Sequence, residues 1–278
     1  MKIENRTFIV SGGSSGLGLA TVHDLLKANA YVSIFDRSVP PTNLPGSHVR
    51  FFKVDITQVK EIEDAVDGTV EWTQETGARL GGVVNCAGVA SAAKIIDKNG
   101  EPHPLDRWDF TLAVNATGSF NLSRIALKHL VKVVPEDTVD GERGVIIFVS
   151  SSAAVGRFDT SIYGYTDGYC LQFEGQPGQT AYAASKGALL AMTLPMARDL
   201  ARYAVRVVTV APGVFASSMT ANFAEKTRRS LESNAIVYPA RLGMPDEFSR
   251  TVRWIVECPY VNGETIRLSG GGRLPAKL

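Results

Sequence analysis

A tyrosine and a lysine four positions apart are the first side chains whose spacing could do chemistry. Tyr182 and Lys186 lie in the segment QTAYAASKGALLAMTL, and helical i, i+4 spacing puts both on one face. A phenol has a pKa near 10, so an unassisted tyrosine is a poor acid–base group at neutral pH. At an effective dielectric of about 20, an ammonium ~4–5 Å away would lower that pKa by roughly two to three units, although burial would oppose part of the shift. The pair predicts a proton-transfer site, with an ordinary amphipathic helix face as the alternative.

A glycine-rich loop, SGGSSGLG at 11–18, follows a strand-like run and opens a helical pattern. Gly12 permits a tight turn, whereas Gly16 and Gly18 let the backbone approach a pyrophosphate and let the helix pack closely on the sheet. The helix N-terminus then offers unpaired N–H groups and a partial positive charge to the anion. The loop therefore predicts a dinucleotide site, with these residues at the cofactor: Gly12, Ser14, Ser15, Gly16, Leu17 and Gly18.

An acidic residue ends the second strand-like run. Asp36 lies 18 residues after Gly18, and a carboxylate there can accept both hydroxyls of an adenosine ribose and would repel a 2′-phosphate. The neighbouring Arg37 could instead attract that phosphate. The balance favours NAD over NADP, and a plain strand-end turn is the alternative for Asp36.

The elements that would position these residues alternate along the chain. Seven runs are apolar almost throughout, as in parallel strands covered on both faces, whereas 57–76 has a helical stripe with Val59, Ile62, Val66 and Val70. Such alternation predicts an α/β fold in one domain over 1–278, a Rossmann-type doubly wound parallel sheet of about seven strands with helices on both faces. The strand-like runs are Phe8–Val10, Tyr31–Phe35, Val49–Val54, Gly82–Asn85, Val145–Val149, Val205–Val210 and Thr265–Leu268.

Composition and charge narrow the function classes. The 278 residues carry 29 Lys and Arg against 28 Asp and Glu, a formal net charge of +1, which does not indicate a nucleic-acid or membrane surface. The three cysteines, Cys86, Cys170 and Cys258, are far apart and odd in number, and the four histidines have no ligand-like spacing. We therefore expect a reducing compartment and no metal site.

Two terminal segments bear on location. The N-terminal MKIENRTFIV contains no apolar signal-peptide region, so secretion is not expected. The last three residues, Ala276, Lys277 and Leu278, are a relaxed form of the peroxisomal Ser-Lys-Leu address, with chance as the alternative. The sequence predicts a peroxisomal enzyme if the host is a eukaryote and a cytoplasmic one otherwise.

Several motifs in order resemble the short-chain dehydrogenase/reductase family over essentially the whole chain. They are SGGSSGLG, NCAG at 85–88, VNATGSF at 114–120, VSSSA at 149–153, YAASK at 182–186 and PGVFASS at 212–218. The blocks RGVIIFVSSSAA, FEGQPGQTAYAASKGALLAMTLPMARDLA, ARLGMPDEF and NGETIRLSG are similar to the family's type 2 3-hydroxyacyl-CoA dehydrogenase subgroup. The resemblance implies an NAD-dependent oxidoreductase that interconverts a secondary alcohol and a ketone, with a 3-hydroxyacyl-CoA as substrate.

The resemblance also implies roles. Tyr182 would exchange a proton with the substrate oxygen, Ser151 would polarise that oxygen, and Lys186 would hold the nicotinamide ribose and lower the Tyr182 pKa. Asn115 would fix a water that relays protons to Lys186, and Gln176 matches a substrate contact. The remaining cofactor contacts would come from Arg37, Asp55, Ile56, Asn85, Cys86, Ala87, Gly88, Pro212, Gly213, Val214 and Ser217.

Plainer readings of these residues stay open. Ser150 or Ser152 could occupy the place given to Ser151, and Asn115 could merely cap or bridge backbone. Cys86 could be a small packed residue of which only the backbone matters. At the level of function, the alternatives are a ketone reductase or alcohol dehydrogenase of secondary metabolism with a bulky substrate, and a non-catalytic nucleotide-binding scaffold. The resemblance further implies a homotetramer or homodimer built on the helix with Tyr182 and the one near 105–134.

An insertion separates the chain from its subgroup. Ser151 and Tyr182 are separated by 30 residues, where the family has about a dozen. The extra material lies at about 155–172 and is rich in aromatic residues, so it could line or cover a substrate pocket. The alternative is a surface elaboration or a subunit contact. The stretches 90–104 and 155–180 are both expected to be loops.

Overall fold

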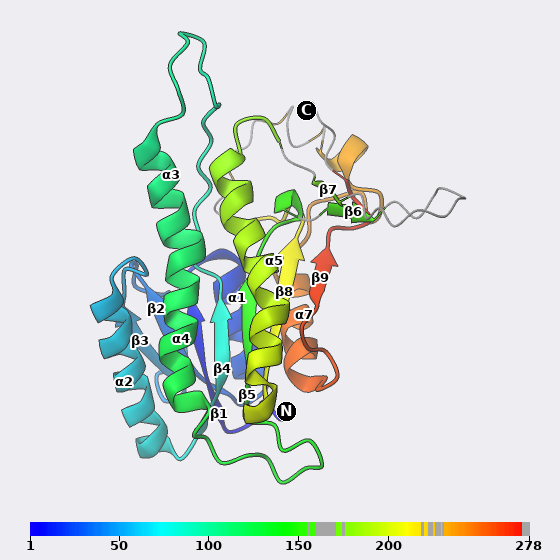
Figure 1. Cartoon of the computed structure of the whole chain (residues 1–278). Helices are drawn as coiled ribbons and strands as arrows, with labels where there is room; N and C mark the ends of the chain where they lie inside the picture. The colour runs from blue at the N-terminus through cyan, green and yellow to red at the C-terminus, as the bar shows by residue number, and fades with distance from the viewer. Residues whose placement is uncertain are drawn as a thin grey trace.

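The computed structural model describes residues 1–154, 156–158, 171–173, 176–217, 220–221, 225, 229 and 231–273. These residues form a seven-stranded parallel sheet in the order β3-β2-β1-β4-β5-β8-β9 (Figure 1). Each predicted strand-like run corresponds to one of its strands, although the run Val49–Val54 extends one residue beyond the end of β3. The prediction of a doubly wound Rossmann-type α/β fold is therefore confirmed. The strands are β1 (Arg6–Ser11), β2 (Tyr31–Asp36), β3 (Val49–Lys53), β4 (Arg79–Asn85), β5 (Gly144–Val149), β8 (Val205–Pro212) and β9 (Thr265–Leu268).

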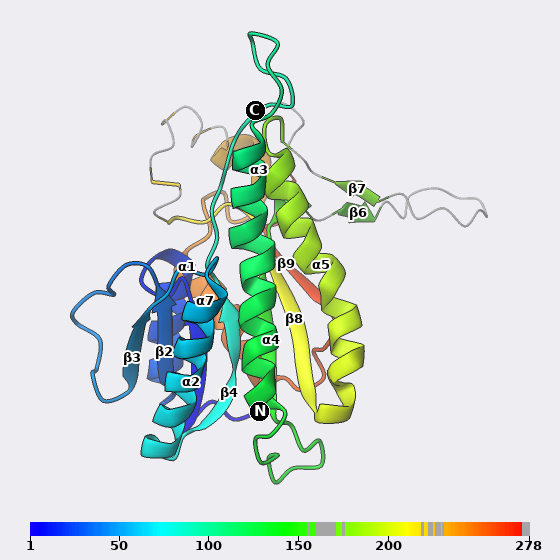
Figure 2. The same cartoon turned by 60° about the vertical axis from the view of Figure 1, so that its left-hand side comes forward.

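Helices cover both faces of the sheet. On one face α1 (Gly16–Lys27) packs against α7 (Pro245–Glu257). On the other lie α2 (Val59–Thr76), α4 (Ser119–Leu130) and α5 (Thr180–Leu200), as Figure 2 shows. Further helical elements are α3 (Leu105–Leu112), the π-helices η1 (Ala113–Gly118) and η4 (Leu231–Ala235), and the short 3₁₀ helices η2 (Ser152–Ala154) and η3 (Ala201–Tyr203).

Each face of the sheet has its own apolar core. The first core joins strand residues such as Phe8 to Leu25 of α1 and Phe248 of α7. The second joins Phe148 of β5 to helices α2, α4 and α5, with Leu189 of α5 fully buried. Alternate residues of each strand supply the two cores, which explains why the central strands are apolar throughout.

The end of the sheet where the strands begin is closed by buried ion pairs. Glu142, just before β5, lies 2.7 Å from the guanidinium of Arg206 in β8, and both side chains are less than a tenth exposed. Arg6, the first residue of β1, contacts Glu136 at 3.0 Å. Pairing offsets part of the desolvation cost of these buried charges, and removing one partner would leave the other uncompensated.

Two expected loops contain short pieces of ordered structure. Residues 156–158 and 171–173 form a small antiparallel pair, β6 (Gly156–Phe158) and β7 (Leu171–Phe173), apart from the main sheet. Within 90–104, Ile96 and Pro102 form an isolated antiparallel bridge. The expectation of plain loops was therefore incomplete, because local backbone pairing gives both segments hairpin geometry. Most of the insertion lies outside the described residues, and its role in the pocket stays a prediction.

Two further points concern location. None of the helices in the described part of the chain is long and apolar enough to cross a membrane. Ala276, Lys277 and Leu278 lie outside the described residues, so the peroxisomal address also stays a prediction.

Candidate active site

The predicted site residues gather at the edge of the sheet where the parallel strands end. β1 and β4 are neighbours in this sheet, and their following helices cover opposite faces. The loops after the two strands therefore separate at a crevice, which is where open α/β sheets bind ligands. The glycine-rich loop follows β1, Asp36 ends β2, Cys86 follows β4 and Ser151 follows β5.

The glycine-rich loop fits tightly against the end of β4. Gly12 has φ +67°, and a side-chain Cβ there would lie 2.8 Å from the backbone nitrogen of Ala87. A Cβ on Gly18 would lie 2.1 Å from the carbonyl oxygen of Gly12. Both distances are shorter than any real carbon contact, so the loop can close into this cradle only with glycine at both positions.

The N-terminus of α1 is open to an anion. Its N-cap residue, Ser15, makes no side-chain capping hydrogen bond. Gly16 has φ +52°, and a Cβ there would meet only the Cβ of Ser217, at 3.7 Å. The backbone N–H groups of Gly16, Leu17 and Gly18 thus lack a capping side chain, and the space before them suits a pyrophosphate.

Asp36 is tied to the same loop. Its two carboxylate oxygens accept hydrogen bonds from the backbone N–H groups of Ser14 (3.1 Å) and Ser38 (3.0 Å). The neighbouring Arg37 is 71% exposed in its side chain and lies 3.9 Å from the carboxylate of Asp55. The carboxylate of Asp36 is therefore fixed beside the expected ribose position, whereas the guanidinium of Arg37 is turned toward another acid.

Asp55 and Ile56 follow β3. The backbone N–H of Thr57 donates to Asp55, and this bond holds the pKa of the Asp55 carboxyl below its usual value. Ile56 is buried, and a Cβ on Gly118 would lie 2.8 Å from its carbonyl oxygen. Asp55 is thus a charged rim residue, and Ile56 is a packed one beside η1.

The segment after β4 contributes backbone more than side chains. Asn85 is buried, donates to Ser123 at 3.1 Å and has an unpartnered Oδ1. Burial raises the pKa of the Cys86 thiol to about 12, so this sulfur is a packed group rather than a nucleophile. Ala87 donates its N–H to the hydroxyl of Ser11 at 3.2 Å, which joins the segment to β1. The plainer reading of Cys86 is the one that the geometry supports.

The segment after β8 borders the glycine-rich loop. Pro212 ends the strand, and Gly213 donates its N–H to Leu268 at 2.8 Å. The carbonyl of Val214 accepts the N–H of Gly243 at 3.0 Å, and Ser217 lies beside Gly16. These bonds hold Val214 and Ser217 across the crevice from α1, where the resemblance expects the nicotinamide end of the cofactor.

Ser151 is the serine that meets Tyr182. The two side chains share a hydrogen bond, which acts to lower the pKa of Tyr182. Ser150 is buried and donates to the carbonyl of Lys186 at 2.8 Å, and Ser152 is buried as well. Of the three adjacent serines, only Ser151 therefore faces the phenol.

Lys186 and Tyr182 lie on the same face of α5, with the ammonium over the phenol ring. The Nζ of Lys186 donates to the carbonyl of Val149 at 2.8 Å and lies 5.9 Å from the centroid of the Tyr182 ring. Burial raises the pKa of the phenol, and the hydrogen bond with Ser151 opposes only part of that rise. Burial also lowers the pKa of Lys186 to about 8. The net direction of the Tyr182 pKa in this structure is therefore upward, because desolvation is its largest cause. The effect of Lys186 on that pKa stays a prediction.

Asn115 uses its whole side chain as a bridge. It is fully buried in η1; its Oδ1 accepts the N–H of Val89 at 2.8 Å, and its Nδ2 donates to the carbonyl of Val89 at 2.9 Å and to Ser185 at 3.0 Å. The alternative that Asn115 bridges backbone groups therefore holds for its side chain. A relayed water would have to use the backbone carbonyl, which also accepts the hydroxyl of Ser119 at 2.9 Å.

Gln176 lies at a cavity of about 670 Å³ beside the first turn of α5. Thr180 and Ala183, which flank Tyr182 in that turn, line it as well. The opposite wall comes from Lys94, Ile95 and Ile96. Ser151, Tyr182 and Lys186 are not among the residues that line this cavity. It is the first turn of α5 that joins the cavity to Tyr182 along the chain.

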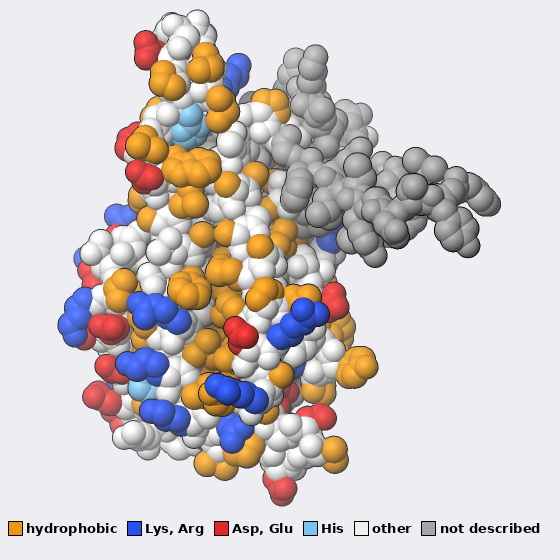
Figure 3. Space-filling model, in the orientation of Figure 1, with side chains coloured by type: hydrophobic (Ala, Val, Ile, Leu, Met, Phe, Trp, Pro, Cys, Tyr) orange, Lys and Arg blue, Asp and Glu red, His pale blue; other side chains and the backbone are white. Residues whose placement is uncertain are grey.

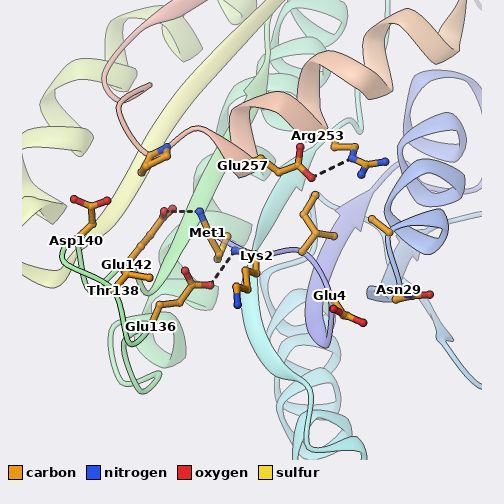
Figure 4. A pocket seen from close by; sticks show the side chains of 13 residues that line it. Met1, Lys2, Glu4, Asn29, Glu136, Thr138, Asp140, Glu142, Arg253 and Glu257 are labelled. Carbon is orange, nitrogen blue, oxygen red and sulfur yellow. Dashed lines mark hydrogen bonds and ion pairs between the residues drawn. The ribbon is translucent and has the colours of Figure 1, made fainter.

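A second cavity, of about 550 Å³, lies at the other end of the sheet. Figure 4 shows its lining, in which the terminal ammonium of Met1 contacts Glu142 and Arg253 contacts Glu257. It contains none of the predicted site residues. Its polar groups belong to the ion pairs that close this end of the fold.

Sequence reasoning missed Val89, Val149 and Ser185. Val89 and Val149 act through backbone groups, which the side-chain type does not reveal. Ser185 sits between two recognised residues of YAASK, and only the packing of α5 against η1 shows its contact with Asn115.

Comparisons with known proteins agree with this geometry. The family model described as short chain dehydrogenase matches residues 6–166, and the one described as Enoyl-(Acyl carrier protein) reductase matches residues 166–272. The 3-hydroxyacyl-CoA dehydrogenase type-2 of Homo sapiens is 36% identical over 271 residues, 96% of this chain and 94% of that protein. Its namesake from Drosophila melanogaster is 37% identical over 277 residues, 98% of this chain and 99% of that protein. The crystal structure of 3-hydroxyacyl-CoA dehydrogenase type-2 from Mycobacterium avium superposes with a TM-score of 0.83 at 30% identity and 98% coverage of both chains.

Removing the buried ammonium should change how stability depends on pH. Because the pKa of Lys186 is about 8 in the folded chain and near 10.5 when unfolded, the unfolded state binds more protons between these values. The free energy of unfolding should therefore rise with pH across this window, by about 3 kcal/mol. Lys186→Met should lack this rise.

Urea unfolding of both proteins at about pH 7.5 and pH 10 measures the difference. Lys27→Met, which removes an exposed lysine from α1, is the matched control and should follow the wild type. Parallel pH dependences for the wild type and Lys186→Met would contradict the burial of a charged group at this position.

Proposed function

The chain belongs to the short-chain dehydrogenase/reductase family, and from that premise we propose that it is an NAD-dependent dehydrogenase of short 3-hydroxyacyl-CoA esters. Membership makes the chain an NAD(P)-dependent oxidoreductase that interconverts a secondary alcohol and a ketone. The preference for NAD, the acyl-CoA substrate and the residue roles are the proposal. The observation that supports it best is the meeting of Ser151 and Tyr182 beside Lys186, at the sheet edge that holds the glycine cradle.

The chain's own groups suit proton transfer at a substrate oxygen. In the reduction direction, the Tyr182 phenol donates its proton to the substrate oxygen, and in the oxidation direction the phenolate form takes that proton back. Ser151 hydrogen-bonds the same substrate oxygen and stabilises its developing charge. One N–H of the Lys186 ammonium donates to the carbonyl of Val149, which leaves two N–H groups for a ribose hydroxyl or a water. A nicotinamide dinucleotide, when bound, supplies the hydride acceptor. The open N-terminus of α1 and the glycine cradle would hold its pyrophosphate.

The substrate class is inferred from the relatives and from the cavity beside α5. The similar proteins reported above are named for 3-hydroxyacyl-CoA. Ile95 and Ile96, both more than half exposed, give the cavity an apolar wall, and Gln176 gives it an amide. An apolar wall with a few polar groups suits an acyl thioester better than a sugar.

A second copy of the chain is the partner we propose. Leu105 of α3 is 70% exposed, and Phe110, Phe120 and Leu194 on α3, α4 and α5 are more than 40% exposed. Figure 3 shows hydrophobic side chains gathered along this face. Such a patch is costly in a monomer, and a homotetramer or homodimer would cover it. Light scattering should give about four or two times 29.9 kDa; a mass of one chain would contradict this assembly.

Turnover of 3-hydroxybutyryl-CoA with NAD tests the proposed reaction. We expect NADH formation with kcat/KM above that of simple secondary alcohols. Tyr182→Phe should lower kcat by about 10²- to 10⁴-fold, because general acid–base catalysis contributes that much, while NADH affinity stays within about twofold. Tyr203→Phe, a tyrosine beyond the far end of α5, is the matched control and should keep wild-type kinetics.

The role of Tyr182, the substrate class and catalysis itself would each be contradicted by a different result. Full activity of Tyr182→Phe would remove the phenol from the mechanism. Turnover of bulky alcohols or ketones with none of the acyl-CoA would favour the ketone reductase alternative. Binding of NADH without turnover of any substrate would favour the non-catalytic scaffold.

Cofactor preference depends on the charge of Asp36. Asp36→Asn keeps the size of the side chain and one oxygen acceptor, but removes the charge that would repel a 2′-phosphate. The ratio of kcat/KM for NAD to that for NADP should fall by about tenfold, the effect of roughly 1.4 kcal/mol of lost repulsion.

Arg37 supplies the control for this experiment. In the double variant Asp36→Asn, Arg37→Ala, the gain toward NADP should be smaller, because the exposed guanidinium that could bind the phosphate is gone. An unchanged cofactor ratio in Asp36→Asn would show that Asp36 does not set the preference.

A further inference from the structure

Ser185 is a fully buried hydroxyl in the middle of the proposed catalytic segment. It lies on α5 between Tyr182 and Lys186, and the proposed reaction assigns it nothing. Its hydroxyl donates to the carbonyl of Tyr182 at 2.8 Å and accepts the Nδ2 of Asn115 at 3.0 Å. The first bond is local to the helix, whereas the second joins two elements that are 70 residues apart.

The contact with Asn115 continues to the segment after β4. The Asn115 side chain accepts the N–H of Val89 at 2.8 Å and donates to its carbonyl at 2.9 Å. A Cβ on the preceding Gly88 would lie 3.2 Å from the Oδ1 of Asn115 and 3.2 Å from the Nζ of Lys186. Ser185, Asn115 and the backbone of Val89 therefore form one hydrogen-bonded chain, and the preceding Gly88 lies between this chain and the ammonium.

This chain uses both donors of the Asn115 side chain. Its amide has two N–H donors, of which one is taken by Val89 and the other by Ser185. Because Asn115 is completely buried, loss of the serine acceptor would leave an amide proton unsatisfied in an apolar surrounding. Unsatisfied buried groups of this kind are costly enough to turn the side chain toward another partner. Turning the amide would also disturb both of its bonds to Val89.

The π-helix makes the arrangement sensitive to that change. Asn115 lies in η1, a wide turn inserted between α3 and α4, and η1 packs against α5. π-turns are rare and occur frequently at functional sites. The amide bridge fixes how this turn sits relative to α5 and hence to Tyr182 and Lys186.

We propose that Ser185 is a positioning residue, which acts through Asn115 to align the catalytic helix with the backbone at Gly88–Val89. The inference rests on the proposed function, since it takes Tyr182 and Lys186 as the reacting side chains. Misplacement of reacting groups by a fraction of an ångström lowers the rate of the chemical step more than it lowers binding. Loss of the hydroxyl should therefore reduce kcat and leave the KM for NAD nearly unchanged.

The test compares two buried hydroxyls on the same helix. Ser185→Ala removes the acceptor without adding bulk, and we expect kcat for 3-hydroxybutyryl-CoA to fall by about tenfold, with the KM for NAD within about twofold of wild type. Thr193→Val is the matched control, because Thr193 is also buried on α5 and its hydroxyl joins Thr209 of β8 at 2.6 Å, two turns from the site. It should lower stability without changing kcat.

A double-mutant cycle distinguishes positioning through Asn115 from a general loss of stability. If Ser185 acts through the amide, Ser185→Ala should reduce kcat in the wild type but add almost nothing in Asn115→Ala. Amide hydrogen exchange gives a readout independent of turnover: the Val89 N–H should exchange faster in Ser185→Ala and at the wild-type rate in Thr193→Val.

The outcomes separate this inference from the proposed function. If the wild type oxidises 3-hydroxybutyryl-CoA and Ser185→Ala matches Thr193→Val in kcat and in Val89 exchange, Ser185 is not a positioning residue and the proposed function stands. Additive losses in the cycle would likewise overturn action through Asn115. If the wild type shows no turnover, the proposed function fails. In that case the exchange rate of the Val89 N–H still tests the inference, because an unchanged rate in Ser185→Ala would show that Ser185 does not position the Asn115 side chain.

Discussion

Lys186 is only 5% exposed, and the residues around it provide hydrogen bonds that stabilise its buried ammonium. Its bond to the carbonyl of Val149, the last residue of β5, replaces one contact with water. The hydroxyl of Ser150 donates to the carbonyl of Lys186, and this bond holds the same turn of α5 against the end of β5. Because Tyr182 stands one helical turn before Lys186, fixing the lysine also fixes the phenol next to Ser151. Desolvation is the cost of this arrangement, and it changes the pKa of both side chains.

The two ends of the sheet differ in function: one end stabilises the fold, and the other holds the candidate active site. Where the strands begin, buried charges are paired, as for Glu142 with Arg206 and Arg6 with Glu136. Where the strands end, α1 lacks a side-chain cap, so the backbone N–H groups of its first turn are left open. Open donors and acceptors destabilise a protein slightly but are what a polar ligand needs. The parallel arrangement makes this separation possible, since all strand ends of one kind meet at one edge.

Asn115 shows how one buried amide can connect three parts of a site. Its bonds reach the segment after β4 through Val89 and reach α5 through Ser185, while its own backbone belongs to η1. An apolar residue of the same size could fill the space but could not fix the register of three elements. A buried polar group of this kind contributes alignment rather than net stability.

The sequence alone determined the sheet, because seven apolar runs and the helical stripes between them follow directly from burial on both faces. It also determined the glycine-rich loop, since the close backbone approach at Gly12 and Gly18 leaves room only for glycine. Tertiary structure alone decided which of three adjacent serines faces Tyr182, because their orientation depends on how β5 ends. It also decided the direction of the Tyr182 pKa shift and the use of the Asn115 amide. Those properties depend on desolvation and on contacts between residues far apart in the chain, which spacing along a helix cannot reveal.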